Sequence, residues 1–165
     1  MHGDWTIDVF EPDGRLVQHH EFKNALLASG WIQLRLVLSR TVAQGEWGID
    51  LHGSTSPQDP CLSGGSPSIC GIVESTSGLS GSSVFKNLSI SLITGGIRLS
   101  GTATAAKDGD IGRVETFAGN CAPSVAPASC VGLTGSNVVT STTLGAPVAV
   151  TTGQQIVATV NITFS

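Results

Sequence analysis

The last part of the chain alternates strictly between apolar and polar side chains. From residue 156 onward every second residue is apolar, and these residues share one face: Ile156, Ala158, Val160, Ile162 and Phe164. This period of two predicts a β-strand that is buried on one side. The upstream chain must then supply neighbouring strands and a second layer over the apolar face, and we expect the chain to end inside its sheet.

Shorter alternating runs recur along the chain, and turn residues separate them. The expected strands cover residues 5–10, 15–22, 47–51, 71–74, 88–93, 97–104, 111–118, 138–144 and 147–150. Pro12-Asp13-Gly14, Gly95-Gly96 and Asp108-Gly109 predict hairpin turns, and Thr152-Gly153 predicts the turn before the last strand. The 21 glycines and a charged fraction of only 12% also favour short strands and tight turns. The pattern predicts a mainly β protein, an antiparallel β-sandwich or jelly roll that begins with a β-hairpin.

One α-helix is expected, over about residues 25–39. Four large apolar residues recur there at helical spacing: Leu27, Trp31, Leu34 and Leu38. We expect this stripe to pack against the core and Asn24 to cap the helix, while Gly30 weakens it by about 1 kcal/mol relative to alanine. The 165 residues are expected to form one domain. In it, 1–45 holds the hairpin and helix, and 46–165 holds the sandwich with two long loops (53–69 and 120–137).

The four cysteines form two pairs with the same spacing. Cys61 and Cys70 bracket CLSGGSPSIC, and Cys121 and Cys130 bracket CAPSVAPASC. Zinc sites usually place roughly two to four residues between paired thiolates, fewer than the eight found here. We expect two local disulfides, with free thiols, zinc binding and cross-paired disulfides as the alternatives. Disulfides in a chain without a secretion signal indicate a particle that leaves the cell and oxidises outside it.

The overall charge argues against nucleic-acid binding. The net charge is −4 with only eight basic residues, whereas a nucleic-acid-binding protein needs a basic patch to neutralise phosphates. No stretch approaches the roughly 20 apolar residues of a membrane-spanning helix. The start, MHGDWTIDVF, lacks the basic region and apolar run of a signal peptide. We therefore expect synthesis in a cytoplasm and no membrane insertion.

Candidate catalytic and metal-ligating residues are few. His19 and His20 are neighbours on an expected strand, so their side chains point to opposite faces and are not expected to share a metal. Two carboxylate–histidine pairs could form if the fold brings their members together: His2 with Asp4, and His52 with Asp50. Asp108-Gly109-Asp110 resembles a fragment of a calcium loop, but the remaining ligands are missing. None of these groups predicts a metal site or a cofactor.

Enzymatic patterns are also weak. Acidic residues that could serve as paired carboxylates are candidates only because acids are scarce: Glu74, Asp108, Asp110 and Glu115. The run GLSGS at 78–82 departs from the G-x-S-x-G nucleophile motif at its last position. The three tryptophans, Trp5, Trp31 and Trp47, could form a sugar-stacking platform, but we expect Trp5 and Trp31 to pack in the core. The sequence therefore predicts a protein that is not an enzyme.

The order of these features resembles the small structural proteins of tailed bacteriophages. The likeness lies in an N-terminal hairpin that leads through FKN (Phe22–Asn24) into a helix, followed by a middle rich in glycine and serine. It continues in the runs LSGTATAAKDGDIGRVETFAG (99–119) and LGAPVAVTTGQQIVATVNITFS (144–165). The two cysteine loops are not part of the family pattern.

This resemblance implies a non-enzymatic virion component, foremost a capsid decoration or cement protein that docks on the shell and stabilises it. A structural subunit of the neck, tail or fibre base is the first alternative. A carbohydrate- or receptor-binding β-sandwich module is the second. The implied partners are copies of the chain itself, expected as a trimer, and a major capsid or tail protein. The resemblance implies no catalytic residue, metal or cofactor.

Overall fold

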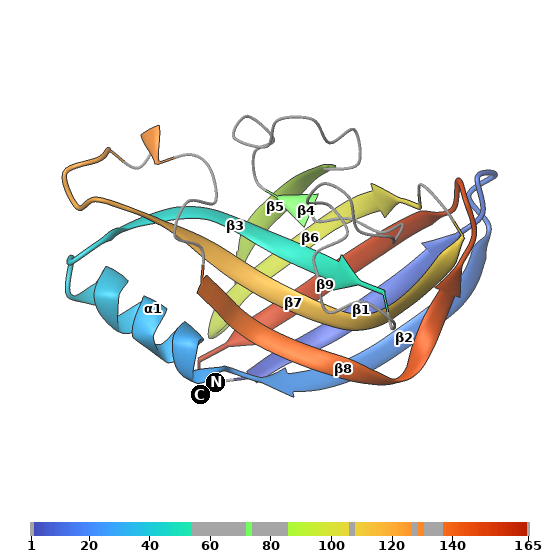
Figure 1. Ribbon diagram of the computed structural model, residues 1–165, viewed down its shortest axis with the longest axis horizontal. Coiled ribbons are helices and arrows are strands. Elements are labelled where there is room, and N and C mark those ends of the chain that lie inside the picture. The colour runs from blue at the N-terminus through green and yellow to red at the C-terminus, as the bar shows by residue number, and fades with distance from the viewer. Residues whose placement is uncertain are drawn as a thin grey trace.

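The computed structural model describes residues 2–53, 72–73, 86–105, 108–126, 129–130 and 137–164. The described chain is mainly β with a single helix, as the sequence predicted (Figure 1). Its elements are β1 (His2–Phe10), β2 (Leu16–Ala25), α1 (Ala28–Leu38), β3 (Ala43–His52), β4 (Ile72–Val73), β5 (Lys86–Ile93), β6 (Gly96–Thr104), β7 (Gly109–Cys121), β8 (Asn137–Val150) and β9 (Gln155–Thr163).

The strands form two antiparallel sheets (Figure 1). The strand order is β2-β1-β9-β6-β5 in the first sheet and β4-β3-β7-β8 in the second, and a short parallel pair between β4 and β5 connects them. The last strand lies between β1 and β6, where Val160 is opposite Trp5 on one side and Leu99 on the other. The prediction that this strand lies inside its sheet is confirmed.

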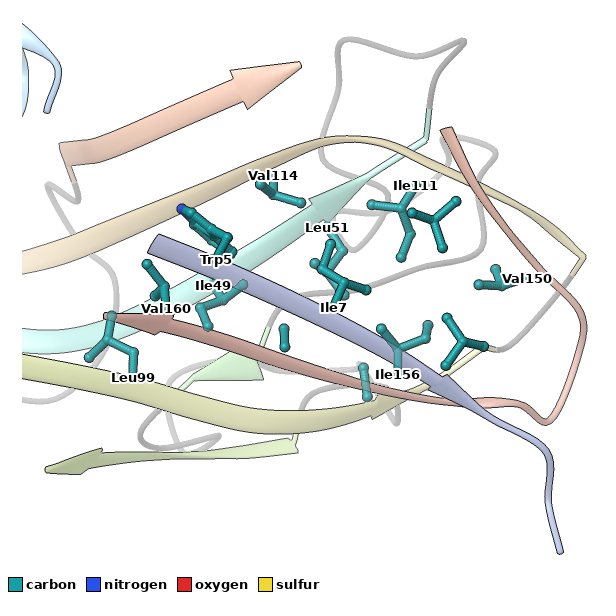
Figure 2. Packing of buried hydrophobic residues seen from close by; sticks show 14 of the residues in the cluster. Trp5, Ile7, Ile49, Leu51, Leu99, Ile111, Val114, Val150, Ile156 and Val160 are labelled. Carbon is teal, nitrogen blue, oxygen red and sulfur yellow. The ribbon is translucent and has the colours of Figure 1, made fainter. Parts of the chain in front are cut away.

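The core lies between the two sheets, and alternate residues of both sheets fill it (Figure 2). On β9 the predicted apolar face is buried from Ile156 to Ile162. On β1 the buried large side chains are Trp5, Ile7 and Val9. Phe164 is 50% exposed, contrary to the prediction, because it follows the end of β9 and lies beyond the core.

The N-terminal hairpin is present, and its second strand is longer than predicted. Gly14 has a φ of +86° in the turn, a conformation that glycine adopts without strain. Strand β2 continues to Ala25, so Asn24 pairs with Gly3 and does not cap the helix. Helix α1 begins only at Ala28, because the sheet pairing holds the preceding residues extended.

The predicted hairpin at Asp108-Gly109 is wrong. Strands β6 and β7 belong to different sheets, so the chain crosses from one layer to the other at this point. The carboxylate of Asp108 accepts hydrogen bonds from the backbone N–H of Thr152, at 2.7 Å, and from its hydroxyl, at 2.8 Å. These bonds tie the crossing to the turn between β8 and β9, where the chain also passes from one sheet to the other, and they lower the pKa of Asp108.

Strand β8 joins the two short strands expected at 138–144 and 147–150. Its pairing with β7 is irregular: Val148 is opposite Ile111, but Thr143 is opposite Arg113, so residues 144–147 face the single Gly112. The strand bends at this bulge. Strands β2 and β8 are the outer strands of their sheets, and the Leu26–Thr140 bridge connects the chain just after β2 to β8.

Candidate interaction surface

Helix α1 lies directly on the backbone of β8. The N–H of Leu27 donates to the carbonyl oxygen of Val139 at 2.9 Å. The Ser29 hydroxyl donates to the carbonyl oxygen of Val138 at 2.5 Å. A Cβ placed on Gly30 would lie 2.5 Å from the oxygen of Val139, closer than real contacts allow. The small residues of the first turn thus bring the helix into contact with the strand.

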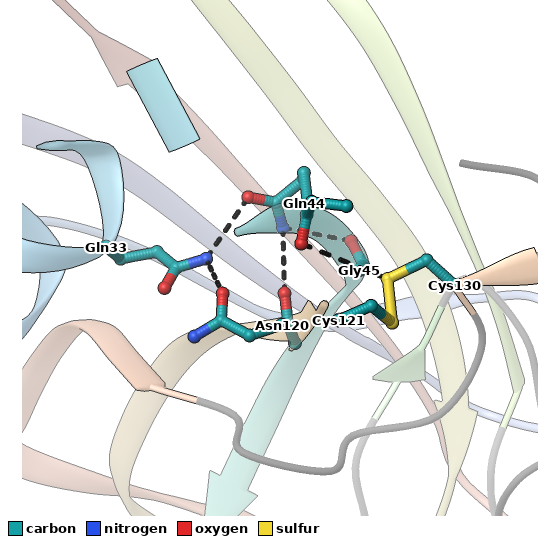
Figure 3. Close-up of a disulfide and its surroundings, with 8 residues drawn as sticks. Gln33, Gln44, Gly45, Asn120, Cys121 and Cys130 are labelled. Carbon is teal, nitrogen blue, oxygen red and sulfur yellow. Dashed lines mark hydrogen bonds between the residues drawn. A yellow bond between two sulfur atoms is a disulfide. The ribbon is translucent and has the colours of Figure 1, made fainter. Parts of the chain in front are cut away.

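A buried amide network holds the middle of α1 (Figure 3). Gln33 is 2% exposed, and its Nε2 donates to Oδ1 of Asn120 at 2.5 Å and to Oε1 of Gln44 at 3.3 Å. Gln44 belongs to β3 and Asn120 to β7. One helical side chain therefore connects α1 to two strands of the second sheet.

A disulfide joins Cys121 to Cys130 beside this network (Figure 3). Their Cα atoms are 5.7 Å apart. Cys121 is the last residue of β7, and Cys130 is 2% exposed. The second of the two predicted pairs is thus present as a disulfide, whereas Cys61 and Cys70 lie outside the described residues.

Three large apolar side chains of α1 point to solvent. Trp31 and Ile32 are each 54% exposed, and Leu38 is 82% exposed. The prediction that the apolar stripe faces the core is therefore wrong for Trp31 and Leu38. The physical reason is that the side carrying Gly30 and Gln33 takes the inward position, because the glycine fits against the strand backbone and the amide satisfies polar groups there.

We define the outer face of α1 as Trp31, Ile32, Arg35, Leu36, Leu38 and Ser39, which share one side of the helix. A hollow of about 270 Å³ lies on it, lined by Ile32, Arg35, Leu36 and Ser39. Arg35 is in the last turn, where a cation also offsets the partial negative charge of the helix end. The face is thus apolar with one cation, Arg35, among its side chains. The contacts of Gly30 and Gln33 hold the opposite side of the helix on the sheets.

A charged cluster occupies the second sheet. Nε2 of His52 lies 3.2 Å from Oε2 of Glu115 and 4.0 Å from Oδ2 of Asp50. Arg113 Nη2 lies 3.3 Å from Nδ1 of His52, and the Ser141 hydroxyl donates to Oε1 of Glu115 at 2.9 Å. Hydrogen bonding from His52, and then from Ser141, lowers the pKa of the Glu115 carboxyl despite its partial burial, and the charge of Arg113 adds to this effect.

The geometry of this cluster does not match nucleophilic catalysis. Ser141 donates to Glu115 and not to His52, so the histidine does not receive the hydroxyl proton as a general base would. The contact with Arg113 leaves Nδ1 of His52 as an acceptor and Nε2–H as the donor to Glu115. The five side chains connect β3, β7 and β8 across the sheet. The predicted pairing of His52 with Asp50 is present only as a 4.0 Å contact within this group.

Two clefts flank the Phe22 side chain. One, of about 320 Å³, lies between β2 and β8 and is lined by residues 20–23 and 142–146. The other, of about 450 Å³, is lined by residues of β1, β2 and β9. In the second cleft Asp4 contacts Lys23 at 3.3 Å, and the predicted partner His2 lies 3.5 Å from it. These polar groups pair with one another at the surface.

The two neighbouring histidines of β2 do not form a joint site. His19 Nδ1 lies 2.6 Å from Oδ1 of Asp8, which raises the pKa of His19. His20 instead approaches Gln18, with Nε2 3.3 Å from Oε1. Among the described residues, no group of three or more histidine, cysteine or acidic side chains could hold a metal ion. No helix in the described part of the chain has the length and apolar character needed to cross a membrane.

The three tryptophans have different surroundings. Trp5 is 2% exposed and stacks on Phe22, with ring centroids 5.8 Å apart, as expected for a core residue. Trp47 is partly buried and packs against the same core. Trp31 lies on the outer face of α1. The sugar-stacking platform considered from the sequence is therefore not formed by these three residues.

Sequence reasoning missed the Gln33 network. A usable signal was present, because Gly30 and Gln33 are three residues apart and define one side of the helix. The small residue allows close contact with a strand backbone, and the amide can pair with buried polar side chains, so this combination marks the inward side of the helix. Gln44 and Asn120 carried no such signal, since the fold alone brings them to Gln33.

Comparison with known proteins gives no match. No protein-family model fits the chain, and no curated protein or solved structure is significantly similar to it.

Proposed function

We propose that this chain is a non-enzymatic structural protein of a tailed-phage virion, a capsid decoration protein that docks on the shell. The observation that carries the docking role is the outer face of α1, where Trp31, Ile32 and Leu38 are exposed together. Contiguous apolar side chains on a soluble surface are typical of protein interaction sites. Tryptophan in particular is enriched among the residues that dominate binding energy.

The contacts that hold α1 against the strands support the same role. Gly30 and Gln33 fix the helix to β8, β3 and β7 before any partner arrives. A surface that is already ordered loses little conformational entropy on binding. A rigid sandwich that presents a fixed helix is suited to repeated docking on identical sites.

The virion context comes from the resemblance of the hairpin, helix and C-terminal strands to small structural proteins of tailed phages. The expected trimer would use surfaces other than the outer face of α1, and pairing of strand edges between copies is one way to form it. A neck, tail or fibre-base subunit would dock in the same way, but at a much lower copy number.

The test is quantitative mass spectrometry of purified phage particles that carry the gene, with labelled peptides of this chain and of the major shell protein as standards. We expect the copy number of this chain to equal that of the major shell protein, or to be a fixed fraction of it. A copy number far below that of the shell protein would move the assignment to the neck, tail or fibre base. Absence from the particles would reject the virion role and favour a free binding module.

A further inference from the structure

We propose that the partner of the outer face of α1 is an apolar surface with acidic residues on another protein, and not a second copy of α1. This inference rests on the proposed docking role and names the chemistry of the partner. The first observation is the distribution of charge. The whole chain has 12 acidic and eight basic residues, but residues 24–45 contain two arginines, Arg35 and Arg40, and no acidic residue.

The second observation is that both arginines are available for a partner. Three other described cations contact carboxylates: Arg15 at 4.0 Å, Lys23 at 3.3 Å and Arg113 at 3.3 Å. Arg35 and Arg40 are exposed, and neither contacts a carboxylate within the described part of the chain. A partner carboxylate would therefore find cations that are not already neutralised.

The third observation is the position of Arg35 in the hollow of about 270 Å³, together with Ile32 and Leu36. An apolar side chain entering this hollow would lie beside the guanidinium group. A partner that places a carboxylate next to that side chain would satisfy both parts of the site. A hollow of this kind also favours a shaped protein surface over a lipid surface.

Charge also argues against a second copy of α1 as the occupant. A two-fold contact brings the same patch of both chains together. It would place Arg35 and Arg40 of one copy near the same residues of the other, and no acidic residue of 24–45 could neutralise them. Like charges in an interface oppose association.

The experiment measures binding of the purified protein to phage particles prepared without this chain, at low and high salt. The variants are Trp31→Ala, the double variant Arg35→Gln with Arg40→Gln, and Arg15→Gln as a control at the β1–β2 turn. Circular dichroism first verifies that each variant is folded. We expect at least about tenfold weaker binding for the double variant and for Trp31→Ala, no change for Arg15→Gln, and weaker wild-type binding at high salt.

The other outcomes separate this inference from the proposed function. Normal binding by the double variant, with binding lost in Trp31→Ala, would reject the acidic partner and retain docking through α1. Normal binding by Trp31→Ala would reject α1 as the docking surface. No binding by the wild-type protein would reject the proposed function itself.

Two further measurements address the rival occupants. Flotation with vesicles of phosphatidylserine and phosphatidylcholine would overturn the inference if the wild-type protein binds and the double variant does not. Sedimentation of the free protein would overturn it if the chain forms a dimer that Trp31→Ala abolishes. The inference predicts neither result.

Discussion

The carbonyl oxygen of Val139 lies 2.5 Å from the position that a Cβ on Gly30 would occupy. Helix α1 therefore rests on β8 at a point where no other residue fits without movement. This contact sets the rotation of the helix about its own axis. With Gly30 inward, Trp31 and Leu38 are turned to solvent, and the apolar side of the helix becomes the candidate interaction surface.

Replacing Gly30 by alanine is expected to destabilise the protein by about 1–3 kcal/mol, the usual range for overpacking. At an unhindered helix position the same change would be stabilising by about 1 kcal/mol. Urea unfolding of Gly30→Ala measures the difference. Gly145→Ala is the control, because a Cβ at Gly145 meets no atom within 4 Å and should leave stability unchanged or slightly higher. A stabilised Gly30→Ala variant would contradict the close contact.

Trp31 is expected to contribute little to folding. Because its side chain is 54% exposed, Trp31→Ala should change the free energy of unfolding by no more than about 0.5 kcal/mol. Trp5→Ala should cost about 3–5 kcal/mol, since Trp5 is 2% exposed and packs between the sheets. Denaturant unfolding of both variants checks the contrast. Equal losses would mean that α1 turns Trp31 inward.

The Cys121–Cys130 disulfide is expected to stabilise the fold by roughly 2.5–3 kcal/mol, the chain-entropy estimate for a loop of this length. The double variant Cys121→Ser with Cys130→Ser should lower the thermal midpoint of the oxidised protein. Scanning calorimetry with and without a reductant measures the effect. Adding the reductant to the wild-type protein should lower its thermal midpoint by at least as much as the double substitution lowers the midpoint of the oxidised protein. An unchanged midpoint in the variant would show that this bond is not important for stability.

Stability should fall in acid partly through Glu115. Its pKa in the folded protein is below the ordinary value of 4.5, mainly because His52 donates a hydrogen bond to the carboxylate. A lowered folded pKa gives stability that is present above the ordinary pKa and is lost as the pH falls through the folded pKa. Glu115→Gln should therefore be less stable than wild type near neutral pH and should show a flatter decline below about pH 4.5.

Urea unfolding between pH 3 and pH 7 gives both curves for Glu115→Gln and for wild type. Glu21→Gln is the control, because its side chain is 73% exposed. The control should follow the wild-type curve. A Glu115→Gln curve parallel to wild type throughout would show that this carboxylate does not contribute to the acid loss.

The strands were predictable because their side chains follow the period of the pleat. Residues 156–162 and 5–9 alternate between apolar and polar, and both segments are buried on the predicted side. The connection at Asp108-Gly109 was not predictable in the same way. Turn residues specify a change of direction, but they do not specify whether the next strand pairs in the same sheet or enters the opposite one.

The sequence predicted that the helix has an apolar side, but it did not predict that this side faces solvent. The spacing of Trp31 and Leu38 correctly indicated one apolar side of a helix. The usual assumption that such a side faces the core failed, because the contact between Gly30 and Val139 determines the orientation of the helix. That contact depends on the position of β8, which lies more than 100 residues further along the chain.

The most direct test of the account is hydroxyl-radical footprinting of Trp31 in intact particles and in the free protein. If the protein docks through α1, Trp31 should be oxidised readily in the free protein and several-fold more slowly in the particle, where the shell would cover the outer face of α1. Trp5 should react slowly in both states because it is buried. Equal oxidation of Trp31 in the particle and in solution would contradict docking through α1.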